Sequence, residues 1–265
     1  MIVASANVNG IRAAQRRGGV EWLAASGAEV VTLQEVRADD GQLRAALDGS
    51  PLASWELAHS PSGAKGRAGV AVLSRHPVKD VRTDVGEEFD GTGRWVEADV
   101  LVAGRLVTVA SAYVHTGEAG TPRQDEKYRF LDAVGARVGA WAADGRLAVL
   151  TGDLNIAHTQ DDLKNWKGNR GKAGFLPEEQ AHLSRWAAEH GLVDVTRRLH
   201  GPGPGPYTWW SWRGQAFDND AGWRIDYQLA TAPLAELAVA ASVGRAPSYA
   251  ERWSDHAAVL VEYAL

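Results

Sequence analysis

The sequence contains no cysteine, which excludes a disulfide scaffold, a thiolate zinc site, an iron–sulfur cluster and a cysteine nucleophile. It has no apolar run of about 18 residues, so we expect no membrane span. The first residues, Met1-Ile2-Val3-Ala4-Ser5, include neither a basic segment nor a long apolar stretch, and no signal peptide is expected. These absences favour a cytoplasmic protein.

What is present is an ordinary globular composition, with 45% hydrophobic and 23% charged residues among 265. The net charge of −5 argues against a general nucleic-acid binder, which usually carries a basic face. However, residues 163–177 hold four basic side chains and no acidic one, so this stretch could still bind phosphates. Tryptophan is abundant, with 11 residues, four of which fall between positions 209 and 223.

The hydrophobic pattern alternates strands and helices along the chain. It predicts strands at 2–8, 29–34, 69–74, 94–102, 106–114, 147–151, 225–230 and 257–263. It predicts helices at 20–25, from Thr121 and Pro122 onward, and from Pro177 to Gly191. The Gly-Pro run at 201–206 resembles a linker, but the segment after it carries candidate site residues. We therefore expect a surface loop inside a single domain spanning 1–265.

Polar side chains close four of the predicted strands. Asn7 and Asn9 are two residues apart and point to one side of an extended backbone, and Glu35 follows the second strand. Tyr113 with His115, and Asp153 with Asn155, end two later strands. At the last two strands the polar residues come first, namely Asp226, Asp255 and His256. If those strands run antiparallel to the others, all these groups meet at one edge of a mixed sheet.

Such a cluster suits metal-assisted hydrolysis of a phosphate ester. Four carboxylates brought together repel one another, and a proton or a cation must relieve the repulsion. Hard oxygen ligands favour magnesium, manganese or calcium. A histidine beside a carboxylate can carry a proton or bind an anionic phosphate. Each of these residues alone is more often a turn, a cap or a surface group, and only their joint pattern points to catalysis.

The motifs that carry these residues resemble, in order, those of the endonuclease/exonuclease/phosphatase superfamily. They are Asn7-Val8-Asn9-Gly10, Leu33-Gln34-Glu35, Gly152-Asp153-Leu154-Asn155 and Ser254-Asp255-His256. Three further segments resemble the exonuclease III family of abasic-site endonucleases: residues 65–70, 169–179 and 222–227. The resemblance runs from about residue 2 to residue 263.

The resemblance implies an α/β fold: a four-layer sandwich of two mixed β-sheets packed face to face, with helices outside. It implies a magnesium-dependent DNA repair nuclease, with manganese as a substitute ion. Such an enzyme hydrolyses the phosphodiester 5′ to abasic sites in double-stranded DNA and removes blocking groups or nucleotides from 3′ ends. The sequence lacks a long basic N-terminal extension, so a bacterial-type enzyme associated with the nucleoid when acting is expected, as a monomer.

The roles implied by the resemblance are as follows. Glu35 would be the main metal ligand, with Asp255 and Asn9 as secondary ones. Asp153 would orient and deprotonate the attacking water, and Asn155 would hold that water or the phosphate. His256, oriented by Asp226, would bind the scissile phosphate, and Asn7 and Tyr113 would complete the catalytic set. The implied DNA contacts are Lys65, Arg67, Asn169, Lys172, Trp209, Arg213 and Trp223, with Trp209 and Trp223 forming the wall that accepts a base-free sugar.

Two other functions are compatible with some of the same residues. A phosphoesterase for lipid or inositol phosphates would keep the catalytic set but would not explain the tryptophan window or the basic stretch. A non-catalytic DNA-binding paralogue is expected to lose one of the catalytic residues, and all are present. The sequence also departs from the family after Tyr113, where relatives often have a proline and an amide but this chain has Val114-His115-Thr116-Gly117-Glu118. The balance between endonuclease and exonuclease activity is therefore left open.

Overall fold

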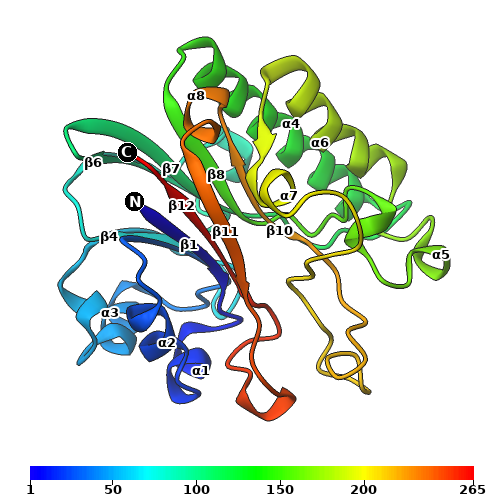
Figure 1. Cartoon of the computed structure of the whole chain (residues 1–265), viewed down its shortest axis with the longest axis horizontal. Coiled ribbons are helices and arrows are strands. Elements are labelled where there is room, and N and C mark those ends of the chain that lie inside the picture. The colour runs from blue at the N-terminus through cyan, green and yellow to red at the C-terminus, as the bar shows by residue number, and fades with distance from the viewer.

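The computed structural model describes residues 1–265 and contains two six-stranded sheets that lie face to face (Figure 1). In the first sheet the strand order is β11 (Ala238–Gly244), β12 (Ala258–Tyr263), β1 (Ile2–Asn7), β2 (Val30–Gln34), β4 (Val70–Ser74) and β3 (Glu56–Ser60). In the second it is β5 (Val78–Arg82), β6 (Trp95–Val102), β7 (Arg105–Tyr113), β8 (Leu147–Asp153), β10 (Asp226–Ala230) and β9 (Val193–Asp194).

Helices cover the outer faces of both sheets. Those beside the first sheet are α1 (Ile11–Arg16), α2 (Gly19–Ala25) and α3 (Asp40–Leu47). The long α4 (Pro122–Ala143) and α6 (Pro177–His190) cover the second sheet (Figure 1). The remaining helices are short: α5 (Trp166–Asn169), α7 (Val195–His200) and α8 (Ala232–Ala235), with 3-10 turns at Pro51–Ser54, Glu87–Phe89, Gln160–Asp162 and Tyr249–Glu251. None of these helices is long and apolar enough to cross a membrane.

The layer between the sheets is filled by small branched side chains. Val3, Val30 and Val72 from the first sheet belong to the same buried cluster as Val109 and Val149 from the second. Valine suits this position because its branched side chain packs closely on a pleated surface. Two further clusters lie between each sheet and its helices. These layers confirm the predicted four-layer α/β sandwich.

The strand directions bring the polar ends together as predicted. β1 is parallel to β2 and antiparallel to β12, while β8 is parallel to β7 and antiparallel to β10. In the register of the second sheet, Asp153 lies opposite both Tyr113 and Asp226. The two strands that begin with polar residues therefore start where the other four end.

Some boundaries and elements differ from the sequence-based predictions. β8 continues through Gly152 to Asp153 rather than ending at Thr151, because Gly152 adopts φ +133° directly against the Ala112 carbonyl. A Cβ there would lie 2.0 Å from that oxygen, so only glycine can continue the strand. The pattern also missed four strands, β3, β5, β9 and β11, all of which lie at sheet edges.

The Gly-Pro run after α7 is a surface connection. Arg197 donates hydrogen bonds to the carbonyls of Gly201 and Gly203, at 3.2 and 2.7 Å. After it, the chain adds β10 to the second sheet and β11 and β12 to the first. We interpret residues 1–265 as one domain on the ground of this interleaving.

Candidate active site

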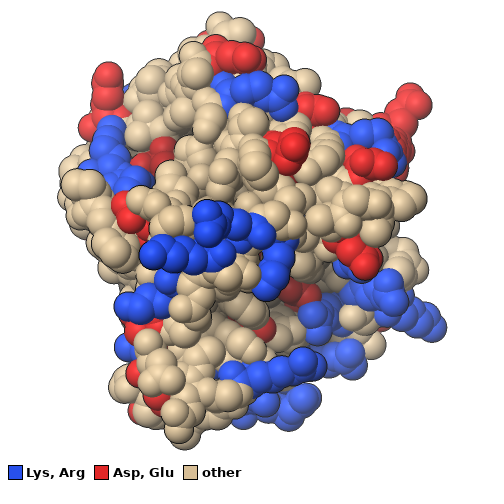
Figure 2. All heavy atoms as spheres, turned by 90° about the vertical axis from the view of Figure 1, so that its right-hand side faces the viewer, with Lys and Arg blue, Asp and Glu red and all other residues tan.

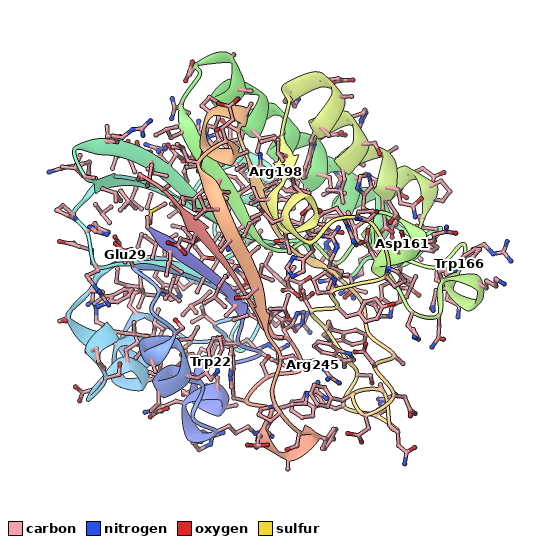
Figure 3. The ribbon with its side chains drawn as sticks, in the orientation of Figure 1. Trp22, Glu29, Asp161, Trp166, Arg198 and Arg245 are labelled. Atoms are coloured by element: carbon pink, nitrogen blue, oxygen red, sulfur yellow. The ribbon has the colours of Figure 1, made fainter.

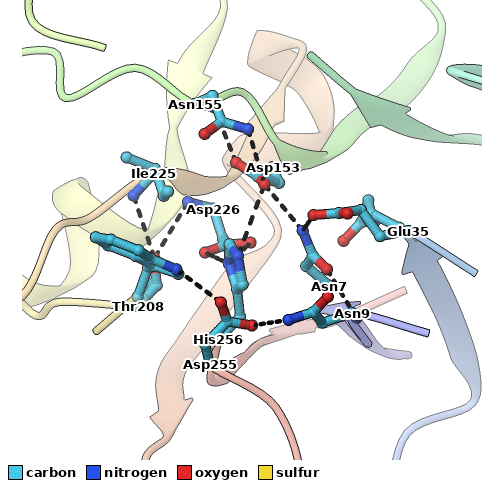
Figure 4. A network of polar contacts seen from close by, with 12 residues as sticks. Asn7, Asn9, Glu35, Asp153, Asn155, Thr208, Ile225, Asp226, Asp255 and His256 are labelled. Carbon is cyan, nitrogen blue, oxygen red and sulfur yellow. Dashed lines mark hydrogen bonds and ion pairs between the residues drawn. The ribbon is translucent and has the colours of Figure 1, made fainter. Parts of the chain in front are cut away.

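The polar strand ends form one wall of a cleft of about 420 Å³. Its lining joins residues from both sheets with others from the loops that follow β8 and α7 (Figure 4). The residues that line it are Asn9, Glu35, Arg37, Tyr113, Thr116, Asp153, Asn155, Asn169, Lys172, Ala173, Gly174, Trp209, Trp223, Ile225, Asp255 and His256. Eleven of the predicted site residues are among them; Asn7 and Asp226 lie directly behind this wall.

Three of the predicted site residues stand on left-handed backbone. Asn9, Glu35 and Asn155 have φ of +46°, +49° and +50°. Non-glycine residues seldom adopt this conformation, and when they do they gather at functional sites. In each case the turn comes just after a strand, and all three residues line the cleft.

Asn7 joins the two carboxylates that face each other across the cleft. Its Nδ2 donates to Glu35 Oε1 and to Asp153 Oδ2, both at 2.9 Å (Figure 4). Asp153 also accepts hydrogen bonds from the backbone N and the side-chain Nδ2 of Asn155, at 2.9 and 3.0 Å. Burial raises the pKa of the Asp153 carboxyl, and the charges of Asp226 and Glu35 raise it further against the opposing effect of His256. The ionised Asp153 carboxylate therefore binds a proton more strongly than an ordinary aspartate does.

His256 is held by Asp226 on its far side. Its Nδ1 lies 2.9 Å from Asp226 Oδ2, and its Nε2 points towards Asp153 Oδ2, 3.8 Å away. The Thr208 hydroxyl fixes the start of β10 by accepting from the backbone N of Ile225 and of Asp226. Burial lowers the pKa of His256, but the charges of Asp226 and Asp153 outweigh it and raise the pKa above its ordinary value. The imidazole is thus cationic at neutral pH, with Nε2–H directed into the cleft.

Asp255 lies on the other side of Asn9 and is partly neutralised by hydrogen bonds. Its Oδ1 accepts from Asn9 Nδ2 at 2.8 Å and its Oδ2 from the Trp209 indole N–H at 3.1 Å. The backbone of Trp209 is bonded on one side to Trp223 and is bridged on the other to His256. The side of the cleft that carries Trp209 and Trp223 is consequently bonded directly to the side that carries Asp255 and His256.

Tyr113 and Arg37 flank Glu35. Burial raises the pKa of the Tyr113 hydroxyl, and the charges of Glu35 and Asp153 add to this, so it remains a neutral hydrogen-bond donor. Arg37 forms an ion pair with Glu35, with its Nε 3.0 Å from Oε2. Sequence reasoning missed Arg37; its place only two residues after the predicted main metal ligand was the available signal.

The sequence model of the Endonuclease/Exonuclease/phosphatase family matches residues 4–256. The chain belongs to this family. The exodeoxyribonuclease of Bacillus subtilis is 33% identical over 245 residues, which cover 92% of this chain and 93% of the relative. The DNA repair nuclease APEX1 of Danio rerio is 34% identical over 236 residues, covering 88% and 74%. The predicted family and the prediction of a hydrolytic enzyme are confirmed.

Solved structures of the family share the whole architecture. An AP endonuclease from Archaeoglobus fulgidus superposes with a TM-score of 0.85 at 25% identity, covering 100% of both chains. The 3′ phosphatase NExo from Neisseria, solved as a variant bound to a product DNA hairpin, gives a TM-score of 0.83 at 28% identity, covering 99% of both. Both proteins match this chain from end to end.

The two tryptophans predicted to form a sugar pocket line the same cleft as the carboxylates. The Trp209 and Trp223 rings meet edge to face with their centroids 6.4 Å apart, and both are half-buried. Trp223 also packs on a small cluster of Ala157, Leu163 and Phe175. Trp223 therefore packs on a loop core and also lines the cleft, beside Trp209.

The predicted basic contacts divide into two groups. Asn169 and Lys172 line the cleft, and Asn169 is the last residue of the projecting helix α5, which begins at Trp166 (Figure 3). Arg67 borders a second depression that shares Glu35, Arg37 and Tyr113 with the cleft, and Lys65 lies further out. The face that carries α5 bears basic side chains on both sides of a hollow (Figure 2). Arg213 is exposed and does not line the cleft.

The chemistry of the donor set fits a hard divalent cation. One ligand atom each from Glu35, Asp153 and His256 lies within 4.8 Å of the others, and the cationic His256 cannot be a ligand while Asp226 keeps it protonated. The remaining oxygen donors are carboxylates and amides, which magnesium and manganese prefer. A cation among them would also relieve the repulsion between Glu35 and Asp153.

Proposed function

We propose that the protein is a magnesium-dependent DNA repair nuclease that hydrolyses the phosphodiester 5′ to abasic sites and also trims or cleans 3′ ends. The observation that carries this proposal is the composition of the cleft. A proton-accepting carboxylate, Asp153, and an imidazolium, His256, face each other in a space whose other walls are two tryptophans and the phosphate-binding candidates Asn169 and Lys172. The named activities of the relatives agree with this chemistry.

In this proposal the chain's own residues divide the work of in-line attack on phosphorus. Asp153 takes a proton from the attacking water, which the Asn155 side chain holds in place. His256 Nε2–H donates to a non-bridging phosphate oxygen and stabilises its developing charge, and Asp226 keeps the imidazolium oriented. The neutral Tyr113 hydroxyl donates to the phosphate or the leaving oxygen, and Asn7 keeps the carboxylates of Glu35 and Asp153 apart.

Glu35, Asp255 and Asn9 would hold the metal ion, magnesium or manganese. When bound, such an ion polarises the phosphate and neutralises its charge. The Asn9–Asp255 hydrogen bond and the Arg37–Glu35 ion pair keep these ligands in place without it.

Replacing Glu35 by alanine is expected to raise the magnesium concentration at half-maximal activity by about tenfold or more, because the main carboxylate ligand is lost. Titration of incision activity with magnesium measures this shift. The matched control is Glu29→Ala, which removes a carboxylate that pairs with His76 outside the cleft. An unchanged titration curve for Glu35→Ala would remove it from the ligand set.

Removing both indoles of the sugar pocket, by Trp209→Ala with Trp223→Ala, is expected to reduce the preference for abasic over intact duplex by about tenfold or more. A flat apolar wall accepts a bare deoxyribose and excludes a base, so losing both rings removes the surface that distinguishes the two duplexes. The ratio of kcat/KM on the two duplexes gives the measurement. Trp55→Ala, in a separate depression beside α3, is the control. Preserved discrimination would place the pocket elsewhere.

The alternative within the family is a phosphoesterase for lipid or inositol phosphates, and the two hypotheses differ in the substrate that is hydrolysed. A substrate panel separates them: abasic duplex, a duplex ending in a 3′ phosphate, an inositol polyphosphate and a sphingolipid phosphodiester. We expect turnover on the two DNA substrates only. Turnover confined to the other substrates would overturn the proposal. We further propose a monomer that acts in the cytoplasm on nucleoid DNA.

A further inference from the structure

An ion pair with no exposed surface lies just outside the cleft. Lys127 on α4 and Glu179 on α6 each have 0% of the side chain exposed, and their charged atoms are 2.6 Å apart. The catalytic roles described above use neither residue. A buried pair of this kind contributes little net stability, because an apolar pair of similar size is often as stable or more stable. Its place in the fold calls for another explanation.

The lysine ammonium has three acceptors, and two of them belong to the loops that form the cleft. Besides Glu179, Lys127 Nζ donates to the Thr116 carbonyl at 3.2 Å and to the Asn155 carbonyl at 2.9 Å. Thr116 follows β7, and Asn155 follows β8. A single cation therefore joins the backbone of both loops from behind the cleft.

The same two loops are tied together on the cleft side through Asn155. Its Nδ2 donates to the Val114 carbonyl at 2.8 Å and to Asp153 Oδ2 at 3.0 Å, and its Oδ1 accepts from the Thr116 hydroxyl at 3.4 Å. Any movement of the Asn155 or Thr116 backbone would change the position of the Asn155 amide relative to the Asp153 carboxylate. Lys127 fixes both backbones at once.

Glu179 and Gln124 extend the connection. Glu179 accepts from the Leu176 backbone N and from Gln124 Nε2, at 3.0 and 3.1 Å. Gly117, at φ +77°, packs directly on this group: a Cβ there would lie 2.4 Å from Gln124 Oε1 and 3.1 Å from Lys127 Cδ. The group thus joins the loop at 114–117, the loop after β8 and the start of α6.

We infer that Lys127, neutralised by Glu179, is a positioning residue that holds the Thr116 and Asn155 loops in register so that the Asn155 amide stays on Asp153. The inference rests on the proposed function for its catalytic consequence. A misplacement of about 1 Å in such a group can cost up to about 10²-fold in rate. The loss falls on kcat rather than KM, because no DNA contact is removed.

The test compares Lys127→Met with the double variant Lys127→Met, Glu179→Leu. The single variant leaves an unpaired buried carboxylate and is expected to lose stability, whereas the double variant removes both charges and regains it. We expect the double variant to recover its unfolding midpoint while kcat on an abasic duplex stays about tenfold or more below wild type, with KM within about twofold. A double variant that recovers kcat together with stability would overturn the inference.

The control is Arg137→Met, on the same helix, which breaks an ion pair with the buried Glu97 away from the cleft. It should lower the unfolding midpoint and leave kcat unchanged. The Asn155 side-chain amide resonances in a ¹⁵N–¹H spectrum give a readout that needs no activity. They should shift in the double variant and not in the control, and unshifted resonances would contradict the inference even if the wild type cleaves no DNA.

If the double variant does not fold, Gly117→Ala takes its place. This change pushes the loop off Lys127 by steric contact and alters no charge. The same fall in kcat and the same shift of the Asn155 resonances are expected, and unchanged values of both would overturn the inference.

Discussion

Asp153→Asn is expected to lower turnover on an abasic duplex by about 10³-fold, within the range that a general base contributes. The amide has the shape of the carboxylate but cannot accept the proton of the attacking water. Binding should change little, because the Asp153 side chain is only 1% exposed and its polar partners are Asn7, Asn155 and His256. Single-turnover incision and fluorescence anisotropy of a labelled duplex measure the two quantities separately.

The same substitution should not destabilise the fold. Burial disfavours the ionised form of Asp153, and the charges of Asp226 and Glu35 add to this against the attraction of His256, so the net effect raises the pKa of the carboxyl. A neutral amide avoids this cost. The unfolding midpoint of the variant should equal or exceed that of the wild type. Turnover close to wild type in a folded variant would exclude Asp153 as the base.

Asp226→Asn should produce the second largest effect, a fall in turnover of about 10²-fold or more, comparable to the loss of other groups that stabilise developing charge. The carboxylate of Asp226 accepts from His256 Nδ1 and is the main charge that keeps the imidazole protonated. An amide in its place neither carries that charge nor favours the same tautomer. His256 would then face the phosphate as a neutral ring and stabilise its charge less.

The pH dependence of kcat is expected to shift in a defined direction in Asp226→Asn. In the wild type the raised pKa of His256 keeps its imidazole protonated at neutral pH. Activity that depends on the imidazolium is therefore lost only as the pH rises through that raised pKa. Without the Asp226 charge, burial lowers the pKa, and the alkaline fall in kcat should begin at lower pH. His182→Gln, outside the cleft, is the control. If kcat of Asp226→Asn begins to fall at the same alkaline pH as kcat of the wild type, His256 does not stabilise the phosphate.

The sequence allowed the centre of the fold and the meeting point of the polar strand ends to be predicted. The central strands β1, β2, β7 and β8 are largely buried and appear in the sequence as apolar runs with polar residues after them. That meeting point depended on β10 and β12 running antiparallel to their neighbours β8 and β1, a condition that the structure meets. The roles assigned to the site residues stay predictions until they are tested by substitution.

Other parts of the structure could not be predicted, for identifiable reasons. β5 is a largely exposed edge strand with three charged residues, which blunt unwanted pairing at the cost of the hydrophobic pattern. β11 is an edge strand of mostly alanine and other small residues, and alanine and glycine are weak strand formers. Lys127 and Glu179 appear in the sequence as ordinary charges on two helices 52 residues apart. Only the packing of α4 against α6 makes them a buried pair, and no local pattern encodes that contact.

The measurement that tests the central claim most directly is incision of a labelled duplex carrying one synthetic abasic site. Wild-type protein is assayed with magnesium and with a chelator, beside an undamaged duplex and Asp153→Asn, and the product ends are mapped. The account predicts one magnesium-dependent cut immediately 5′ to the lesion, no comparable cut in the undamaged duplex, and loss of the cut in the variant. A folded wild-type protein that leaves the abasic strand intact with magnesium present would contradict it.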